Sequence, residues 1–293
     1  MSGFSDYMAD AALNFVSGQQ PAPAIGNRFL ALFTTAPTDA GTGGTEVSTS
    51  GTAYARQQIA GAVTAAGAIS TGSATFTGPN VSGFPWVVPG MNVYDVTASK
   101  QIGTLLSWIG TTVTLTGNAA NNGSGSTDVL QFSAFPAAGS SAPSTVTNGG
   151  VIAFAAATGA GFGTVVAFGI YDAVTSGNLL DWDYMGNFSW APVTVSSASP
   201  GVITMKANGL TVADTVVFST EYGGTAPSFS QSNFTGLLAV AHQATDTLDV
   251  TNAATAVNTS STGSGMVRKV GSQAVPAGVT ASFAASALTL SAA

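Results

Sequence analysis

Residues 151–171 read VIAFAAATGAGFGTVVAFGIY and contain no charged side chain. A run of about 20 apolar residues is long enough for a helix that spans a membrane. Gly159, Gly161 and Gly163 interrupt this run, and β-branched and aromatic residues are frequent on both sides of them. These features favour strands over a helix. We therefore predict two buried strands joined by a glycine turn, with a membrane span as the disfavoured alternative.

Short strands and small polar turns continue over most of the chain. Runs of β-branched, aromatic and aliphatic residues alternate with turns of Gly, Ser, Thr and Asn. This spacing is typical of an all-β sandwich or barrel. The clearest predicted strands are residues 29–34, 92–96, 111–116, 165–171, 202–205, 216–219, 247–250 and 288–290.

One helix is predicted, near the N-terminus. Its apolar residues recur at intervals of three and four, which places them on one face. They are Phe4, Tyr7, Met8, Ala11, Ala12, Phe15 and Val16. Ser2 or Ser5 can cap the start of the helix, and Gly18 ends it. The favoured interpretation is a helix packed on the sheet, and the alternative is an arm that docks into a neighbouring subunit.

Charged residues are scarce. They make up 6% of the 293 residues, against about 25% in soluble domains, and the net charge is -7. The basic residues are Arg28, Arg56, Lys100, Lys206, Arg268 and Lys269. Only the last two are adjacent, so the chain lacks the clustered basic face that binds nucleic-acid phosphates. A neutral surface suits a protein covered by its neighbours in an assembly, and we therefore expect a homo-oligomer.

The absence of cysteine excludes disulfides, thiolate metal ligands and cysteine nucleophiles. The first twenty residues lack a basic segment followed by a continuous apolar one. We therefore expect no signal peptide, and assembly in a cytoplasm.

Two parts of the chain echo each other. Residues 88–96 and 110–128 form one pair of segments, and residues 202–218 and 244–265 form the other. In each pair a strand leads through a turn to a second strand, and a further strand runs into a loop of Asn, Ala, Ser and Gly. We interpret them as two small β modules of one type.

Three further segments carry recognisable motifs. Residues 29–59 contain PTDAGTG, EVS and YAR, residues 162–182 read FGTVVAFGIYDAVTSGNLLDW, and VPAGVTASFAASALTLSAA closes the chain. These motifs, which include Glu46, Tyr54 and Arg56, resemble those of a short tail-fibre-like β domain of tailed-bacteriophage virion proteins. The resemblance implies virion structure rather than catalysis.

The resembling domain is compact and lacks the material between these segments, which implies two insertions at the echoed modules. The second insertion resembles a β module of phage appendage proteins but has Asn208 and Ala213 where His and Gly are usual. The fold implied is a sandwich-like core with an N-terminal helix and two inserted small β modules. Its predicted parts are core residues 1–72, 136–194 and 268–293, first module residues 73–135 and second module residues 195–267. Strands 29–34, 165–171 and 288–290 should then share one domain.

Candidate catalytic residues are few. The single histidine, His242, lies in the run LLAVAHQ, and we interpret it as a half-buried strand residue. One histidine in the chain excludes a histidine triad of metal ligands. Asp39 and Asp172 lie in turns, where an aspartate side chain accepts hydrogen bonds from nearby backbone N–H groups.

A pair of acids resembles a glycosidase site only superficially. Asp181 and Asp183 flank Trp182, and alternate residues of a strand share a face. Tyr184 and Trp190 follow closely, as in a sugar cleft. A turn after NLL explains the cluster equally well, so we disfavour a depolymerase and leave contact with sugar open.

We therefore predict no enzyme, no catalytic residue, no cofactor and no metal ligand. The predicted function is that of a structural protein of a tailed-bacteriophage virion, as a tail or fibre component or a capsid decoration protein. We expect it to be assembled in the host cytoplasm and to contact other virion proteins and identical copies through β-edge and apolar surfaces, without nucleic acid or membrane. The alternative is a module at a fibre tip that binds a receptor or a host-surface glycan.

Overall fold

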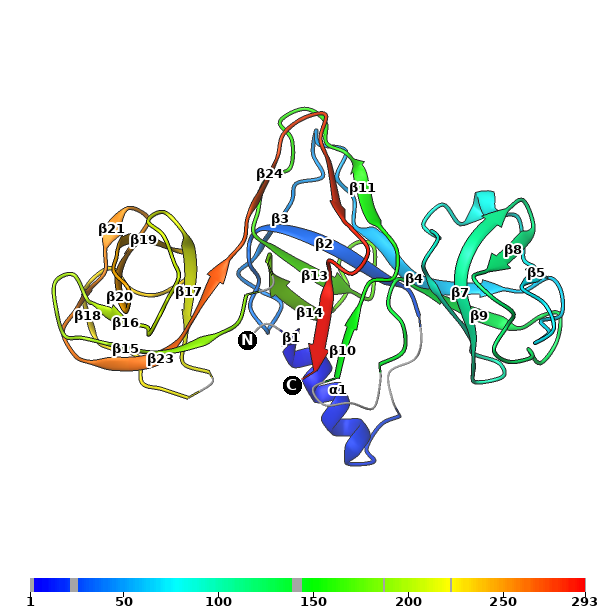
Figure 1. The fold of residues 1–293 in the computed structure, drawn as a ribbon, viewed down its shortest axis with the longest axis horizontal. Helices are drawn as coiled ribbons and strands as arrows, with labels where there is room; N and C mark the ends of the chain where they lie inside the picture. The colour runs from blue at the N-terminus through cyan, green and yellow to red at the C-terminus, as the bar shows by residue number, and fades with distance from the viewer. Residues whose placement is uncertain (1–2, 22–25, 139–143, 187, 222, 293) are drawn as a thin grey trace. The chain divides into compact units, whose positions relative to one another are not determined.

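The computed structural model describes residues 3–21, 26–138, 144–186, 188–221 and 223–292. These residues form an all-β fold with one α-helix near the N-terminus, as the sequence predicts (Figure 1). They divide into two compact units. The smaller unit comprises Tyr184–Gln273, and the larger comprises the described residues up to Asp183 and from Ala274 onward. No helix within the described ranges has the length and apolar character needed to cross a membrane.

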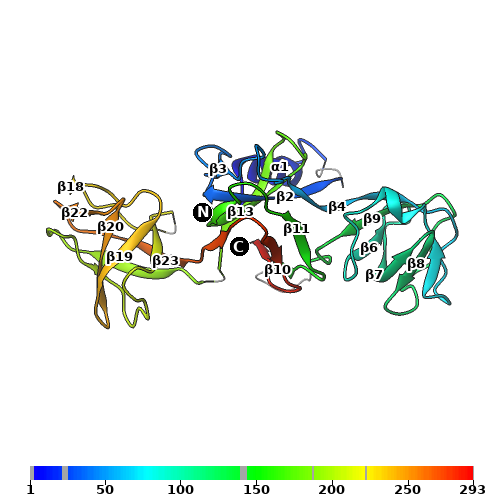
Figure 2. The same ribbon diagram turned by 90° about the horizontal axis from the view of Figure 1, so that it is seen from above.

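One sheet of 11 strands runs through the larger unit (Figure 2). In the order of its hydrogen-bonded neighbours it contains β1 (Gly3–Phe4), β14 (Leu179–Tyr184), β13 (Ala167–Tyr171), β2 (Arg28–Thr35), β4 (Gln57–Thr64), β9 (Val129–Ser133), β6 (Asn92–Asp95), β7 (Lys100–Ile109), β8 (Thr112–Leu115) and β5 (Thr75–Thr77). A short strand, β3 (Thr45–Glu46), also pairs with β2.

Strands β2 and β13 form the centre of this unit's core. They pair antiparallel, with Phe33 opposite Ala167. Five consecutive residues of β2 and all five residues of β13 are buried. A strand buried on both faces carries a continuous apolar run rather than an alternating one, which explains the uncharged sequence of residues 151–171. That stretch forms three strands instead of the two predicted, because Val166 interrupts the second: β11 (Ile152–Ala156), β12 (Gly163–Val165) and β13.

The C-terminal segment returns to the larger unit and pairs with the middle of the chain. It forms three two-stranded sheets: β10 (Ser144–Thr147) pairs with β26 (Thr289–Ala292), β11 with β25 (Thr280–Phe283), and β12 with β24 (Gln273–Val275). The strands predicted at residues 29–34, 165–171 and 288–290 therefore lie in one unit, although they come from opposite ends of the sequence.

The segment between β4 and β9 extends the same sheet. Thr64 lies opposite Val129 in the register, so the chain leaves and re-enters the sheet at adjacent positions. This segment holds β5 to β8 and a 3-10 helix, η1 (Val81–Gly83). Two aromatic rings of this segment, Phe84 and Trp108, stack in succession with the ring of Phe132 on β9. Val93 on β6, Ile102 on β7 and Val113 on β8 are fully buried.

The smaller unit is a seven-stranded sheet that closes on itself through the pairing of β16 with β20. Its strands, in order, are β16 (Ile203–Thr204), β15 (Ala191–Val195), β23 (Gly263–Val270), β17 (Thr215–Ser219), β19 (Leu238–Gln243), β20 (Thr247–Asn252) and β21 (Thr255–Ala256), with β18 (Phe229–Gln231) and β22 (Asn258–Thr259) as a separate pair. Its own core is built around Ile203, Val216, Leu238 and Val267. The amide of Gly271 donates to the carbonyl of Met185 at 2.7 Å. The chain therefore enters and leaves the smaller unit at adjacent positions.

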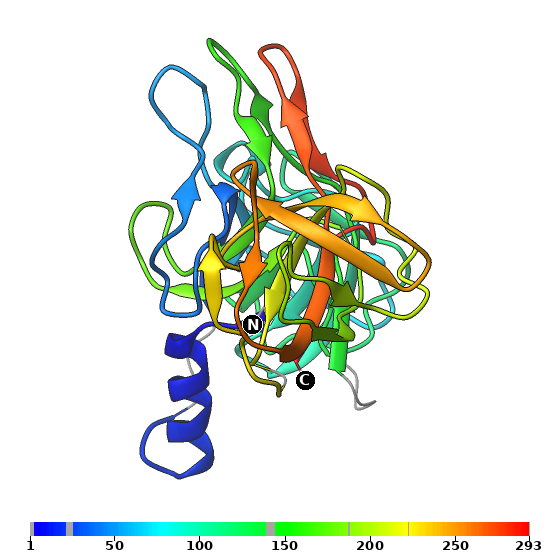
Figure 3. The ribbon, with the colours of Figure 1, turned by 90° about the vertical axis from the view of Figure 1, so that its left-hand side faces the viewer.

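Helix α1 (Asp6–Val16) contradicts the favoured sequence interpretation. Its start is fixed, because the buried Ser5 donates from Oγ to the carbonyl of Leu179 at 2.5 Å and from its amide to Leu180 at 3.0 Å. No residue of the helix itself is buried. Phe15 is 54% exposed and Val16 80% exposed. The helix therefore does not pack on the sheet, and it projects beyond the strands of its unit (Figure 3).

Candidate functional site

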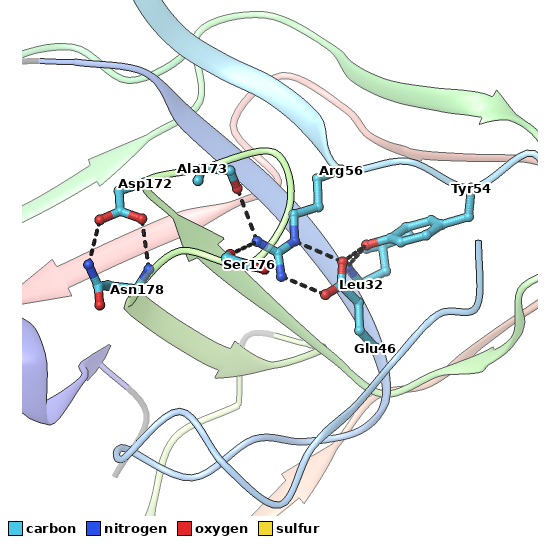
Figure 4. Close-up of polar contacts among 8 residues, drawn as sticks. All are labelled: Leu32, Glu46, Tyr54, Arg56, Asp172, Ala173, Ser176 and Asn178. Atoms are coloured by element: carbon cyan, nitrogen blue, oxygen red, sulfur yellow. Dashed lines mark hydrogen bonds and ion pairs between the residues drawn. The ribbon is translucent and has the colours of Figure 1, made fainter.

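A partly buried ion pair joins two of the sequence motifs in the larger unit (Figure 4). Glu46, from the EVS motif, accepts two hydrogen bonds from Arg56 of the YAR motif. Arg56 Nη2 lies 2.7 Å from Glu46 Oε2, and Arg56 Nε lies 2.9 Å from Glu46 Oε1. The Arg56 side chain is only 9% exposed. Such a bidentate arginine–carboxylate pair is stronger and more directional than a single contact.

The third motif residue completes this cluster. Tyr54 donates from its hydroxyl to Glu46 Oε1 at 2.8 Å and accepts the amide of Leu32 at 2.9 Å. Burial, together with the charge of Glu46, raises the pKa of Tyr54 above its ordinary value, so the phenol stays protonated. Burial alone would lower the pKa of Arg56, but the hydrogen bond and charge of Glu46 outweigh it and raise that pKa.

The same arginine reaches the YDA motif. Arg56 Nη1 donates to the carbonyls of Ala173 at 3.0 Å and Ser176 at 2.7 Å, and Arg56 Cζ lies 3.5 Å from the centre of the Tyr171 ring. Asp172 shapes this turn by accepting the amide of Asn178 at 2.7 Å. We name Glu46, Tyr54, Arg56 and Tyr171 the arginine cluster. Its polar groups bond to one another and to the backbone, so its chemistry is that of a clamp between chain segments.

The acidic cluster around Trp182 does not form an open cleft. Asp181 is 8% exposed and Trp182 is 5% exposed. The Trp182 indole donates from Nε1 to Asp39 Oδ1 at 2.8 Å, which holds the ring inside the protein. Burial, followed by the charges of Asp183 and Asp39, raises the pKa of Asp181 to about 7. A buried acid beside a buried indole cannot line a sugar cleft on the surface.

Other residues singled out in the sequence have structural partners. Asp39 shapes more than its own turn, since its carbonyl also accepts the amide of Asp6 at the helix start at 2.9 Å. His242 lies on β19 as predicted, but its side chain is 83% exposed rather than half-buried. The irregular pairing between β19 and β20 at this position turns the ring outward, where its Nδ1 lies 2.9 Å from Asp249 Oδ1. In the smaller unit, Arg268 Cζ lies 5.9 Å from the centre of the Trp190 ring.

One hollow escaped the sequence analysis. A cavity of about 540 Å³ in the larger unit is lined by Gln57, Gln58, Pro85, Trp86, Pro89 and Met91, with further residues from the start of β11. None of its lining residues is charged. The Gln58 amide is held in place, because its Nε2 donates to Asn27 Oδ1 and to the carbonyl of Ala60, each at 3.2 Å. The run FPWVVP, an aromatic ring between prolines, was the available signal. We call this cavity the Trp86 groove.

Comparison with known proteins gives one family. The sequence model described as Podophage GP4 fiber I protein gp80 matches residues 3–133 and 110–213. The two overlapping matches cover well over half of the 293 residues. No curated protein and no solved structure matches the chain.

Proposed function

The chain belongs to the family of the podophage GP4 fiber I protein gp80, and we propose from this premise how it acts as a structural component of a phage tail fibre. It holds neighbouring virion proteins and identical copies through apolar and strand-edge surfaces. The observation that carries this proposal is the exposed apolar face of α1. A fixed helix start combined with exposed Tyr7, Phe15 and Val16 on the apolar face is typical of a surface that a neighbour covers in an assembly.

Charge supports the same interpretation. Two of the six basic residues have little exposure: the Arg56 side chain in the arginine cluster is 9% exposed, and Arg268 in the smaller unit is 4% exposed. Lys269 lies 2.8 Å from Asp214 in an ion pair. Few cations are left for attraction between subunits, so apolar burial and backbone pairing become the means of attachment.

Self-association tests the helix face. Replacing Phe15 and Val16 by Asp on the exposed part of the apolar helix face should convert an oligomer into a smaller species without unfolding it, measured by light scattering coupled to size exclusion. Val212→Asp is the matched control, because Val212 is 63% exposed but lies in the smaller unit. Most specific subunit contacts have dissociation constants below about 100 µM. A wild-type chain that is still a monomer at about 100 µM would therefore contradict the proposal.

The position in the virion needs a separate experiment. Antibody labelling of purified particles distinguishes a fibre component, labelled only at the tail, from a capsid decoration protein, labelled over the head. We expect label at the tail, because the family is a fibre family. Label confined to the head would contradict a fibre role.

We also propose that a core of residues 1–72, 136–194 and 268–293 carries two insertions, residues 73–135 and 195–267. Near the ends of these segments the chain leaves and re-enters at adjacent positions, at Thr64 and Val129 for the first and at Met185 and Gly271 for the second, which is how loop tips accommodate inserted domains. Replacement of residues 195–267 by a short Gly-Ser linker should leave a folded remainder with its strand content intact by circular dichroism. An unfolded remainder would contradict this organisation.

A second candidate function is recognition of a neutral host glycan in the Trp86 groove. The specific observation is an uncharged lining that combines one indole with fixed amide groups, the groups with which proteins stack against and hydrogen-bond sugars. Trp86→Ala should abolish glycan-array binding, whereas Tyr7→Ala, which removes an exposed aromatic ring of α1, should preserve it. Binding to no neutral glycan by the wild-type chain would remove this candidate.

A further inference from the structure

Two aspartates are buried in the segment between β4 and β9 without a charged partner. Asp95 ends β6 and is 0% exposed, and Asp128 precedes β9 and is 2% exposed. The Oδ2 atom of each carboxylate has no hydrogen-bond partner among the described residues. No ion pair joins either side chain to a basic group in the part of the chain that the structure describes. Lys100 is opposite Asp95 in the strand register, but its side chain is exposed.

The two unpartnered oxygens converge on one place. A Cβ atom at Gly123 would lie 2.2 Å from Asp128 Oδ2 and 3.2 Å from Asp95 Oδ2. The two oxygens are therefore at most about 5.4 Å apart, a limit within which one Ca²⁺ with ligand distances of about 2.3–2.6 Å can contact both. Gly123 must stay a glycine, because any side chain there would collide with the Asp128 carboxylate.

Neutral contacts hold this arrangement in place. Asp95 Oδ1 accepts the amide of Ala98 at 2.8 Å, and the Asp128 carbonyl accepts the amide of Ala65 at 2.8 Å. The amide of Val96 donates to the carbonyl of Val129 at 2.8 Å and ties the two strand ends together. The strand pairing therefore fixes the backbone at both aspartates, and the bond from Ala98 also orients the Asp95 carboxylate.

A buried carboxylate without a counter-charge costs far more free energy than a small domain has in reserve, so the pair must be neutralised. One shared proton would remove only one of the two negative charges. A divalent cation removes both, and oxygen ligands of this kind are those that Ca²⁺ prefers. We infer that Asp95 and Asp128 bind a hard divalent cation, Ca²⁺, beneath the loop of residues 117–127. This inference goes beyond the fibre role and adds a metal ion to a chain whose sequence suggested none.

Calcium titration of the full chain tests this site. The protein is first treated with a chelator at pH 7.5, and CaCl₂ is then added during isothermal calorimetry. We expect saturable binding of one ion per chain and a thermal midpoint that rises by about 5 °C at saturation. Asp95→Asn and Asp128→Asn keep the side-chain shape, and each should weaken Ca²⁺ binding at least about 100-fold. The control Asp10→Asn removes an exposed carboxylate of α1 and should bind Ca²⁺ like the wild type.

The alternative of a shared proton gives the opposite results. In that case Ca²⁺ would leave the wild-type thermal midpoint unchanged at pH 7.5. That result would overturn the cation site. Retention of wild-type Ca²⁺ affinity by both Asn variants would also overturn it, by placing the bound ion elsewhere.

Discussion

The buried Asp181 should make the protein less stable as the pH rises. Its pKa is raised to about 7 in the folded chain, from an ordinary value of 3.8. Between these two values the folded state holds a proton that the unfolded state has released. The free energy of unfolding therefore falls as pH rises from about 4 to about 7, by about 4 kcal/mol at most for a shift of about three pH units. The contribution is fully present below about pH 4 and fully lost above about pH 7.

Asp181→Asn removes this dependence, because the amide carries no charge at any pH. We expect the variant to match the wild type at pH 4 within about 1 kcal/mol and to exceed it by about 2–4 kcal/mol at pH 8. Urea unfolding of both proteins at intervals from pH 4 to pH 8, followed by tryptophan fluorescence, gives the difference directly and cancels the titration of other groups. Asp10→Asn is the control and should give no pH-dependent difference. An Asp181→Asn variant that is less stable than the wild type at pH 8 would refute the assignment.

The remaining predictions concern the arginine cluster, one strained turn and the virion interface. Glu46→Gln removes the charged partner of the Arg56 side chain, which is 9% exposed, and should lower the free energy of unfolding by about 3 kcal/mol in urea titrations. Lys269→Gln, at an ion pair nearer the surface, should lower it by less than about 1 kcal/mol. Ala213 has a φ of 71°, so Ala213→Gly should raise the thermal midpoint, with a gain of about 0.5–1 kcal/mol, and a lowered midpoint would contradict this. The protein should stay on purified particles in about 1 M NaCl, where the screening length is about 3 Å, and its release by salt alone, measured in the supernatant, would show a charge-driven interface.

Much of the fold follows from the sequence because local patterns determine strands. Each of the runs predicted as a strand coincides with a strand of the structure to within one or two residues, apart from the break at Val166. A run of β-branched residues predicts a strand, and the Gly, Asn and Ser residues that bound it predict where the strand begins and ends. The capping serine at the helix start is equally local: the amide of Met8 donates to Ser5 Oγ at 3.3 Å.

Burial could not be predicted in the same way. The apolar face of α1 has the periodicity of a helix that packs on its own sheet, and periodicity does not say whether the cover is the same chain or a neighbour. His242 lies in an apolar run, yet the irregular pairing of its strand turns it outward. The cavity lined by Trp86 joins residues about 30 and 95 positions apart in the sequence, and only the folded sheet brings them together.

For the candidate site, too, the sequence indicated which residues matter but not the contacts that they make. The resemblance pointed to Glu46, Tyr54 and Arg56 as a set. Their contacts join strand β3, the segment before β4 and the turn after β13, which only the folded chain brings together. The DWD run suggested paired acids on one face. In the structure its aromatic residue and its first acid point into the protein, where Asp39 receives the indole.

The distribution of charge connects the core to the interface. Composition alone gives 6% charged residues, and several of these lie inside: Arg56, Asp95, Asp128, Asp181 and Arg268 are buried or nearly so. The outer surface is therefore still poorer in charge than the composition suggests. A surface of that kind exerts little long-range attraction or repulsion on its neighbours. Its contacts with neighbours then depend on shape complementarity and buried apolar area. The exposed apolar residues of α1 provide such a surface, and the hydrogen bonds of Ser5 and Asp39 fix the start of the helix that carries it.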